Sequence, residues 1–335
     1  MKKSLMTLGV LALFVLMAYG QEKKFALYSV AFYNMENLFD TIHDEGKNDY
    51  EYLPNGTNQW NTMKYKAKLK NMSEILSMLS TDKLPMGPAI IGVSEIENYR
   101  VLEDILKQPA LADRGYQYVH YEGADQRGVD CAFFYNPKLF ELTNSKLVPY
   151  VYINDTVHKT RGFLIASGNI AGEKMHFIVN HWPSRAAASP ARERAGEQVR
   201  AIKDSLLRED SAAKIVIMGD MNDDPMDKSM AVALGAKRKP ADVGPTDLYN
   251  PWWDTLKKGY GTLMYKGKWN LFDQIVFTGN LLGTDRSTLK FYKHEIFRRD
   301  FMFQKEGKYK GYPKRTQAGG VWLNGYSDHL PTIIY

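Results

Sequence analysis

The polar side chains that could carry chemistry in this chain stand at or near the ends of apolar, strand-like runs. Asp328 and His329 come directly before the final apolar run, Thr332 to Tyr335. A carboxylate can hold a metal ion, and an imidazole can accept or donate a proton near neutral pH, so this pair could do both at a strand entrance. The other polar residues in such positions are Asn34, Glu95, His181, Asp220, Asn222 and Asp273.

The oxygen-rich character of this set limits the kind of metal that it could hold. Strand ends in layered α/β folds converge on one edge of the sheet, where binding sites usually lie. Carboxylate and amide oxygens gathered there suit a hard divalent cation, for which Mg²⁺ and Mn²⁺ are the first candidates and Ca²⁺ a third. The sequence has neither the His spacing nor the cysteine cluster that is typical of a structural zinc site.

The elements that would position these residues alternate between strands and helices. Apolar residues at helical spacing predict amphipathic helices over 62–80 and 189–208, and 101–106 suits a short helix. The expected strands cover 25–34, 88–93, 129–135, 174–180, 214–218, 272–277 and 332–335. Many strands with interspersed helices predict a layered α/β sandwich. The polar stretch 40–61 is expected to be a surface loop, and the absence of repeats and linkers favours a single domain over 25–335.

The N-terminus has the pattern of a secretory signal peptide over residues 1–20. Lys2 and Lys3 precede a short apolar run, and small residues at Ala18 and Gly20 suit cleavage after Gly20. The run is short for a membrane anchor, which is the alternative. Cys131 is the only cysteine, so no internal disulfide forms. We therefore expect an exported monomer, periplasmic or secreted, from a Gram-negative bacterium.

The charge of the chain suits an anionic partner. The formal net charge is +6, and it becomes +4 when Lys2 and Lys3 leave with the signal peptide. This charge suits nucleic acid, phosphorylated small molecules or a membrane surface, and does not choose among them.

The order Asn, Glu, His, Asp-x-Asn, Asp, Asp-His resembles the endonuclease/exonuclease/phosphatase superfamily, which has the deoxyribonuclease I-like fold. The sharpest matches are Gly-Asp-Met-Asn at 219–222 and Ser-Asp-His-Leu-Pro at 327–331. The segment 180–184 looks like the His motif of the family, with Trp182 where a Leu is usual. The resemblance spans 27–335 and implies a four-layer α/β sandwich of two mixed β-sheets flanked by helices.

The resemblance also implies a role for each residue in the hydrolysis of a phosphoester. The implied metal ligands are Asn34, Glu95 and Asp328. The implied catalytic residues are His181, Asp220, Asn222, Asp273 and His329, with Asp220 orienting the attacking water and Asp273 holding His329. Arg161 would approach a substrate phosphate. The alternatives are structural: Asn34 could cap a turn, and Asp220 and Asn222 could be ordinary turn residues.

Three functions compete at this point. The first is an exported nuclease or phosphodiesterase that uses in-line attack by water. The second is a phosphatase, or a phosphoesterase of the sphingomyelinase or inositol-phosphate type, with the same fold. The third is a non-catalytic phosphate-binding protein, which predicts a missing catalytic residue, whereas none is missing. A long apolar loop of the kind that a lipid-directed enzyme would insert into a membrane is not present, which favours soluble substrates.

Asp130 lies inside an apolar run, which is an unusual position for an acid. We expect its side chain either to reach the site or to pair with an arginine.

Overall fold

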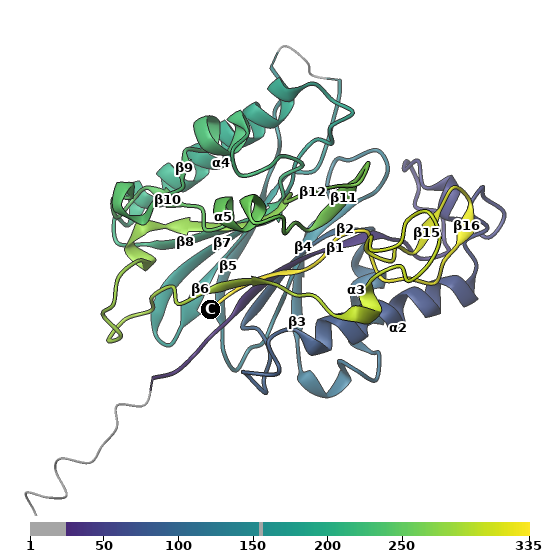
Figure 1. The fold of residues 1–335 in the computed structure, drawn as a ribbon, viewed down its shortest axis with the longest axis horizontal. Coiled ribbons are helices and arrows are strands. Elements are labelled where there is room, and N and C mark those ends of the chain that lie inside the picture. The colour runs from purple at the N-terminus through teal and green to yellow at the C-terminus, as the bar shows by residue number, and fades with distance from the viewer. Residues whose placement is uncertain (1–24, 154–156) are drawn as a thin grey trace, which may run out of the picture.

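Two β-sheets packed face to face form the centre of the computed structural model, which describes residues 25–153 and 157–335 (Figure 1). The predicted signal peptide, 1–20, lies outside the described residues. No helix within the described residues is long and apolar enough to cross a membrane.

The first sheet has six strands, and its two central strands run parallel. In the order in which they pair, the strands are β14 (His294–Ile296), β17 (Thr332–Ile334), β1 (Val30–Leu38), β2 (Ile90–Ile96), β4 (Asp130–Tyr135) and β3 (Gln117–His120). The last strand of the chain, β17, is antiparallel to both of its neighbours, so the sheet is mixed.

The second sheet has seven strands and is also mixed, because β7 and β8 run parallel while β13 opposes β8. In pairing order the strands are β5 (Glu141–Val148), β6 (Phe163–Ile170), β7 (Glu173–His181), β8 (Lys214–Asp220), β13 (Asp273–Thr278), β10 (Leu248–Tyr249) and β9 (Ala236–Lys237). Two small hairpins lie outside the sheets: β11 (Leu263–Tyr265) with β12 (Lys268–Asn270), and β15 (Gln317–Ala318) with β16 (Val321–Trp322).

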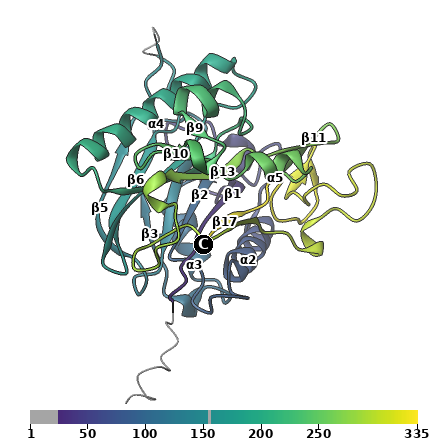
Figure 2. The same cartoon turned by 60° about the vertical axis from the view of Figure 1, so that its left-hand side comes forward.

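Helices cover the outer faces of both sheets. Figures 1 and 2 show α4 (Ser189–Glu209) over the second sheet, and α2 (Thr62–Met78) and α3 (Tyr99–Leu106) over the first. The short helix α5 (Trp253–Lys257) follows β10. These layers confirm the predicted four-layer α/β sandwich.

The sequence of β8 shows why the layers form. Ile215 and Ile217 pack against the α4 side, whereas Val216 and Met218 belong to the apolar cluster between the sheets. Because successive strand residues point to opposite faces, a strand buried on both faces must be a continuous apolar run. The same alternation places Asp220, the last residue of β8, on the inner face between the sheets.

Most predicted elements are confirmed within two or three residues, and the exception is the first strand. It was expected over 25–34 but extends over Val30–Leu38, which includes polar residues. The pairing of β1 with β2 is irregular between Asn34 and Leu38, where Glu36 and Asn37 have φ of 47° and 52°. A bulge of this kind continues a strand through residues that do not alternate between apolar and polar.

Candidate active site

The register of the second sheet places three predicted site residues in one row. His181 is the Cα partner of Asp220 across β7 and β8, and Asp220 is the partner of Asp273 across β8 and β13. All three side chains are buried. A row that crosses three neighbouring strands is fixed by backbone hydrogen bonds, so these side chains are held close together before any ligand binds.

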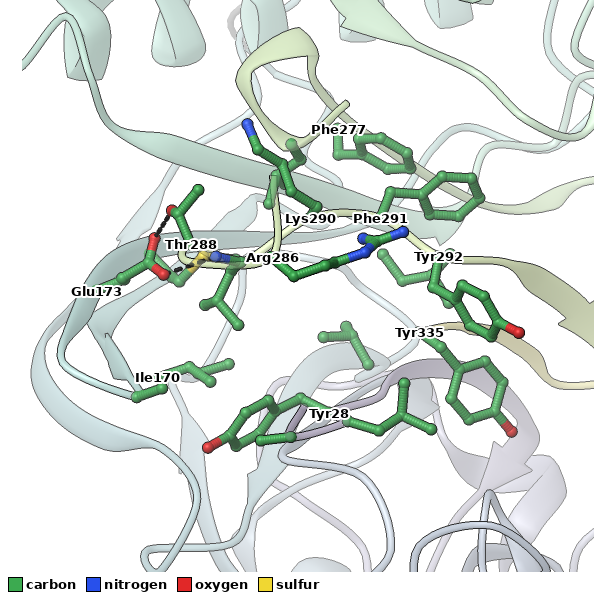
Figure 3. A pocket seen from close by; sticks show the side chains of 18 of the residues that line it. Tyr28, Ile170, Glu173, Phe277, Arg286, Thr288, Lys290, Phe291, Tyr292 and Tyr335 are labelled. Carbon is green, nitrogen blue, oxygen red and sulfur yellow. Dashed lines mark hydrogen bonds between the residues drawn. The ribbon is translucent and has the colours of Figure 1, made fainter. Parts of the chain in front are cut away.

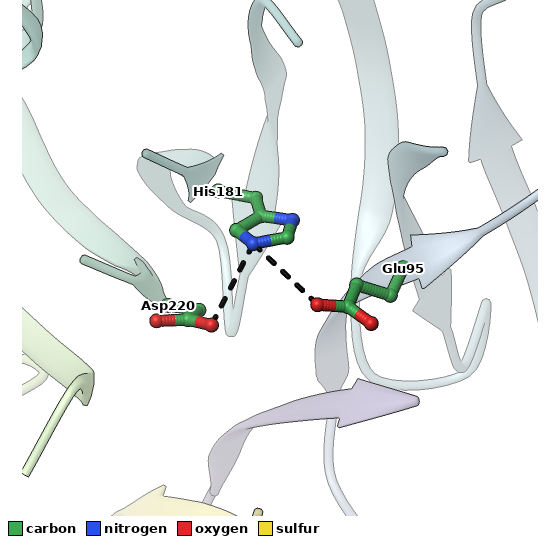
Figure 4. Close-up of side chains that lie close together, drawn as sticks. All are labelled: Glu95, His181 and Asp220. Carbon is green, nitrogen blue, oxygen red and sulfur yellow. Dashed lines mark ion pairs between the residues drawn. The ribbon is translucent and has the colours of Figure 1, made fainter. Parts of the chain in front are cut away.

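A fourth residue, Glu95, reaches the row from the other sheet. Figure 4 shows the His181 ring between the two carboxylates, with Nε2 3.6 Å from Glu95 Oε1 and 3.6 Å from Asp220 Oδ2. Glu95 stands in a bulge of β2, where its φ is 57°. Left-handed backbone is uncommon for a glutamate and is found mostly where function requires a particular direction of the side chain.

Asn34 links the two carboxylates. Its Nδ2 donates to Glu95 Oε1 at 3.2 Å and to Asp220 Oδ2 at 3.0 Å. Its Oδ1 accepts a hydrogen bond from the backbone N–H of Glu36, which fixes the orientation of the amide. The structure therefore brings Asn34 into the site, but presents its NH₂ group to the carboxylates, and its oxygen is used by the backbone.

His329 and Asp273 form a close pair beside this group. His329 Nδ1 lies 2.7 Å from Asp273 Oδ2, and His329 Nε2 lies 3.8 Å from Asp220 Oδ2. Burial alone would lower the pKa of His329, but the carboxylates of Asp273 and Asp220 raise it well above its ordinary value. Asp273 Oδ1 is buried and has no hydrogen-bond partner among the described residues.

Burial shifts Asp220 and His181 away from their charged forms. It raises the pKa of Asp220 to about 7, although the nearby His329 opposes the rise. Burial, and then the positive charges of Arg161 and Arg127, lower the pKa of His181 well below its ordinary value. One imidazole of the site is therefore neutral and the other is protonated at neutral pH, a separation of pKa values that is typical of acid–base sites.

Asn222 completes the loop after β8. Its backbone N–H donates to Asp220 Oδ1 at 2.9 Å, and its φ is 51°. Its Nδ2 donates to the carbonyl oxygen of Trp182 at 3.0 Å. Asn222 therefore joins the ends of β7 and β8, next to the carboxylate that it helps to orient.

Asp328 lies in an adjoining group of charges rather than in the cluster around His181. Its Oδ2 is 2.9 Å from Arg315 Nη2, and Arg315 Nε donates to Glu36 Oε1 at 2.9 Å. Glu36 is buried near the equally buried Lys68, 3.8 Å away. Burial and then Asp328 raise the pKa of Glu36. This network is not among the features predicted from the sequence: the position of Glu36 inside the apolar run 33–39 was the available signal for that acid, and Arg315 had none.

The guanidinium of Arg161 is bound by other residues of the protein. Its Nη1 is 2.9 Å from Asp125 Oδ2, and its Nη2 donates to the carbonyl oxygen of Trp182. Both charged side chains are almost completely buried. The guanidinium therefore holds the loop before β4 against the end of β7, and it influences His181 by its charge.

Arg161→Met is expected to destabilise the fold by about 3–5 kcal/mol, because it leaves the Asp125 carboxylate buried without its partner. The measurement is urea unfolding followed by circular dichroism. Arg127→Met is the matched control, since Arg127 is half exposed and 3.7 Å from the same carboxylate, and exposed pairs contribute about 0–1 kcal/mol. Wild-type stability of Arg161→Met together with a raised KM would instead assign this arginine to the substrate.

Asp130 pairs with a histidine rather than an arginine. Its Oδ2 lies 3.2 Å from His120 Nε2 and accepts a hydrogen bond from Gly123 N–H. Asp130 therefore neither reaches the site nor pairs with an arginine, contrary to what was expected. The role of the pair is to fasten the turn between β3 and β4.

The residues of the site suit a divalent cation. Glu95, His181 and Asp220 each offer a ligand atom, and these atoms lie within 4.8 Å of one another. Burial is the main cause of the raised pKa of Asp220, and the nearby carboxylates of Asp273 and Glu95 add to it. A hard cation with oxygen ligands would relieve the repulsion among these carboxylates.

Two large cavities differ in their relation to this site. A cleft of about 1110 Å³ reaches it, with Glu36, Asn37 and Asp328 in its lining. A second cavity of about 500 Å³ contains none of the predicted site residues and lies near the start of β1, where Figure 3 shows Tyr28, Phe277 and Phe291 around it and Thr288 donating to Glu173. The cleft therefore borders the site at Asp328, whose Oδ1 lies 3.9 Å from His329 Nε2.

Comparison with known proteins gives one family and several similar folds. A model of the Endonuclease/Exonuclease/phosphatase family matches residues 29–335. No curated protein matches the chain at a significant level. Among solved structures, a mannosyl-6-phosphatase of Bacteroides thetaiotaomicron is 14% identical, with a TM-score of 0.57 and coverage of 92% of this chain and 99% of the other.

Two further structures are similar over the same share of this chain. TDP2 of D. rerio, complexed with a single-strand DNA product, is 15% identical, with a TM-score of 0.53 and coverage of 92% and 97%. The catalytic domain of human Nocturnin, with bound sulfate, is 14% identical, with a TM-score of 0.52 and coverage of 92% and 93%. At these identities the structures show a shared fold.

Proposed function

The chain belongs to the endonuclease/exonuclease/phosphatase family, whose members are metal-dependent hydrolases of phosphoester bonds. We propose that this protein is an exported phosphodiesterase that acts on nucleic acid. The observation that carries the proposal is the pair of His329 and Asp273 facing Asp220 across 3.8 Å. A protonated imidazole and a carboxylate at this separation can act side by side, the imidazole on a phosphate oxygen and the carboxylate on the attacking water. The apolar run at 5–17 after Lys2 and Lys3 supports export.

The residues of the site divide the work of an in-line displacement. Asp220, whose Oδ1 is held by the backbone N–H of Asn222, orients a water and accepts its proton. His329 keeps its Nδ1 on Asp273 and presents protonated Nε2 to a phosphate oxygen, where it stabilises the charge of the transition state. Neutral His181 holds the Asp220 and Glu95 carboxylates apart and accepts a hydrogen bond or a proton. No covalent intermediate is needed, because positioning and electrostatics carry most of phosphoryl transfer.

A divalent cation would be held by Glu95 and Asp220, with His181 offering a third ligand atom, whereas Asp328 is paired with Arg315. When bound, the cation supplies positive charge to the phosphate and to the leaving oxygen. Asn34 keeps the two carboxylates in place, and a rotation of its amide would turn its oxygen toward the same point. Mg²⁺ and Mn²⁺ are the ions that this set of donors fits best.

The purified protein is expected to hydrolyse phosphodiesters only when a divalent cation is present. The assay compares plasmid DNA, single-stranded DNA, RNA, bis-p-nitrophenyl phosphate, sphingomyelin and a sugar phosphate, each with Mg²⁺ and with EDTA. Hydrolysis of the nucleic acids that EDTA abolishes and Mg²⁺ restores supports the proposal. Release of phosphate from the sugar phosphate alone would make the protein a phosphatase, and activity in EDTA would contradict metal dependence.

A further inference from the structure

Most of the residues that line the cleft beside the active site have no role in the proposed hydrolysis; Asp328, an implied metal ligand, is the exception. The volume of the cleft, about 1110 Å³, is at the upper end of the range for ligand sites, which is about 300–1,000 Å³. The lining of the cleft includes Asn37, whose N–H donates to Glu95 Oε2 at 2.9 Å, and Asp328, whose Oδ1 lies 3.9 Å from His329 Nε2. A ligand in the cleft would therefore lie next to the catalytic group.

One wall of the cleft carries three tyrosines from two separate segments. Tyr265 stands at the tip of the β11–β12 hairpin, and Tyr309 and Tyr312 stand in the loop before β15. The Tyr312 hydroxyl accepts a hydrogen bond from Gly267 N–H at 2.6 Å, which joins the loop to the hairpin. Figures 1 and 2 both show these segments side by side at one end of the molecule. The tyrosine wall is thus one unit, although its parts are more than forty residues apart.

Two of the three tyrosines in this wall are largely exposed to solvent, although burial of an aromatic ring is energetically more favourable. Tyr265 is 62% exposed and Tyr309 is 52% exposed. The Tyr309 ring lies edge-on to Tyr312, with centroids 5.4 Å apart. Tyr52 also lines the cleft, and its ring is stacked on Phe39 with centroids 4.1 Å apart, which fixes its position. Exposed aromatic rings that line one cleft are suited to contact a planar ring of a ligand.

Positive charge surrounds the same wall. Lys266 Nζ lies 5.3 Å from the centroid of the Tyr265 ring, and Lys308 Nζ lies 5.5 Å from that of Tyr309. The segment 298–315, which forms much of this end of the molecule, has seven Lys or Arg residues against two acidic ones. Basic residues interleaved with aromatic ones are the pattern by which proteins hold single-stranded nucleic acid without reading its sequence.

We infer that the tyrosine wall binds an unpaired nucleobase of a single-stranded nucleic acid whose neighbouring phosphate lies at Asp220 and His329. This inference rests on the proposed phosphodiesterase function and narrows it, because a base in a duplex is stacked and paired and does not offer a face to the cleft. Lys266 and Lys308 then contact the phosphates that flank the bound base. Any of the four bases fits, since each has a planar face.

The test distinguishes recognition of the nucleobase from recognition of the phosphate. The double variant Tyr265→Ala/Tyr309→Ala is compared with wild type on a single-stranded oligonucleotide and on an oligonucleotide of the same length that has abasic sites around the cleavage position. The KM for the normal oligonucleotide is expected to rise at least about 5-fold in the variant, while kcat changes less than about 2-fold. On the abasic substrate the variant and the wild type should have the same KM.

Three controls make the result specific. The variant Tyr265→Phe/Tyr309→Phe keeps the rings and should behave like the wild type. Tyr121→Ala removes an exposed tyrosine that is not part of the cleft and should leave the KM unchanged. Thermal unfolding verifies that the alanine variants are folded, which is expected because both side chains are mostly exposed.

Several results would overturn the inference. An unchanged KM in the double alanine variant would do so, as would an equal loss on the abasic substrate or a larger loss on a sugar phosphate than on the oligonucleotide. Binding of a fluorescent oligonucleotide, measured by anisotropy in EDTA, tests the cleft without catalysis. If the wild type binds the oligonucleotide through the tyrosines but hydrolyses no phosphodiester, the proposed function fails and the nucleobase site stands.

Discussion

Asp220→Asn is expected to lower kcat at least about 100-fold, which is the usual contribution of a group that moves a proton in the transition state. The amide has nearly the shape of the carboxylate and can still accept the hydrogen bond from Asn222 N–H. It cannot take a proton from water and offers a cation much less charge. The measurement is kcat with saturating substrate and Mg²⁺.

The stability of the same variant distinguishes lost chemistry from lost structure. The folded pKa of Asp220, about 7, is above the ordinary value of 3.8, so ionisation of this group lowers the stability of the fold as the pH rises between these values. At about pH 8, in EDTA, Asp220→Asn should therefore unfold at the same or a higher temperature than the wild type. Asp49→Asn, a change of a buried acid that pairs with His43 outside the site, should keep kcat while losing stability. A large loss of stability in Asp220→Asn would contradict this assignment.

His329→Ala is expected to lower kcat by a similar factor, at least about 100-fold. Asp273→Asn should have a smaller effect with a distinct pH dependence. Asp273 and Asp220 raise the pKa of His329 against the effect of burial, so loss of the Asp273 charge lowers that pKa. The imidazole of His329 then loses its proton at a lower pH. The alkaline limb of the profile of kcat/KM against pH should therefore move toward lower pH.

The His329 variants have a matched histidine control. His294→Ala removes a partly buried imidazole that bonds to Thr255, far from the row of site residues along the strands. It should leave both kcat and the pH profile unchanged. Near-wild-type activity of a folded His329→Ala protein would remove this histidine from the mechanism.

Much of the fold could be predicted because local patterns determine it. The helical spacing at 62–80 and the continuous apolar run at 214–218 correspond to α2 and β8, since burial on one face or on both leaves different periodicities in the sequence. The edge strand β5 (Glu141–Val148) was not expected, because it is half exposed and has no apolar run. The positions of Asp220 and Asp273 at strand ends also followed from local pattern alone.

The contacts of the site were harder to predict because they join residues that are far apart in the chain. The amide orientation of Asn34 depends on the backbone of Glu36, which stands in a left-handed bulge that propensities do not reveal. The pairing of Arg161 with Asp125 turned an expected substrate contact into a buried link between two loops. Arg315 meets Asp328 through a loop with no regular pattern before it.

The two sheets each provide a part of the site: Glu95 and Asn34 belong to the first sheet, and His181, Asp220 and Asp273 belong to the second. A cation held by Glu95 and Asp220 would therefore link the two sheets across the interface of the sandwich. Binding of such a cation would shift the unfolding equilibrium toward the folded state and is expected to slow unfolding as well. The same residues that are proposed to perform the hydrolysis would then also lengthen the lifetime of the folded molecule.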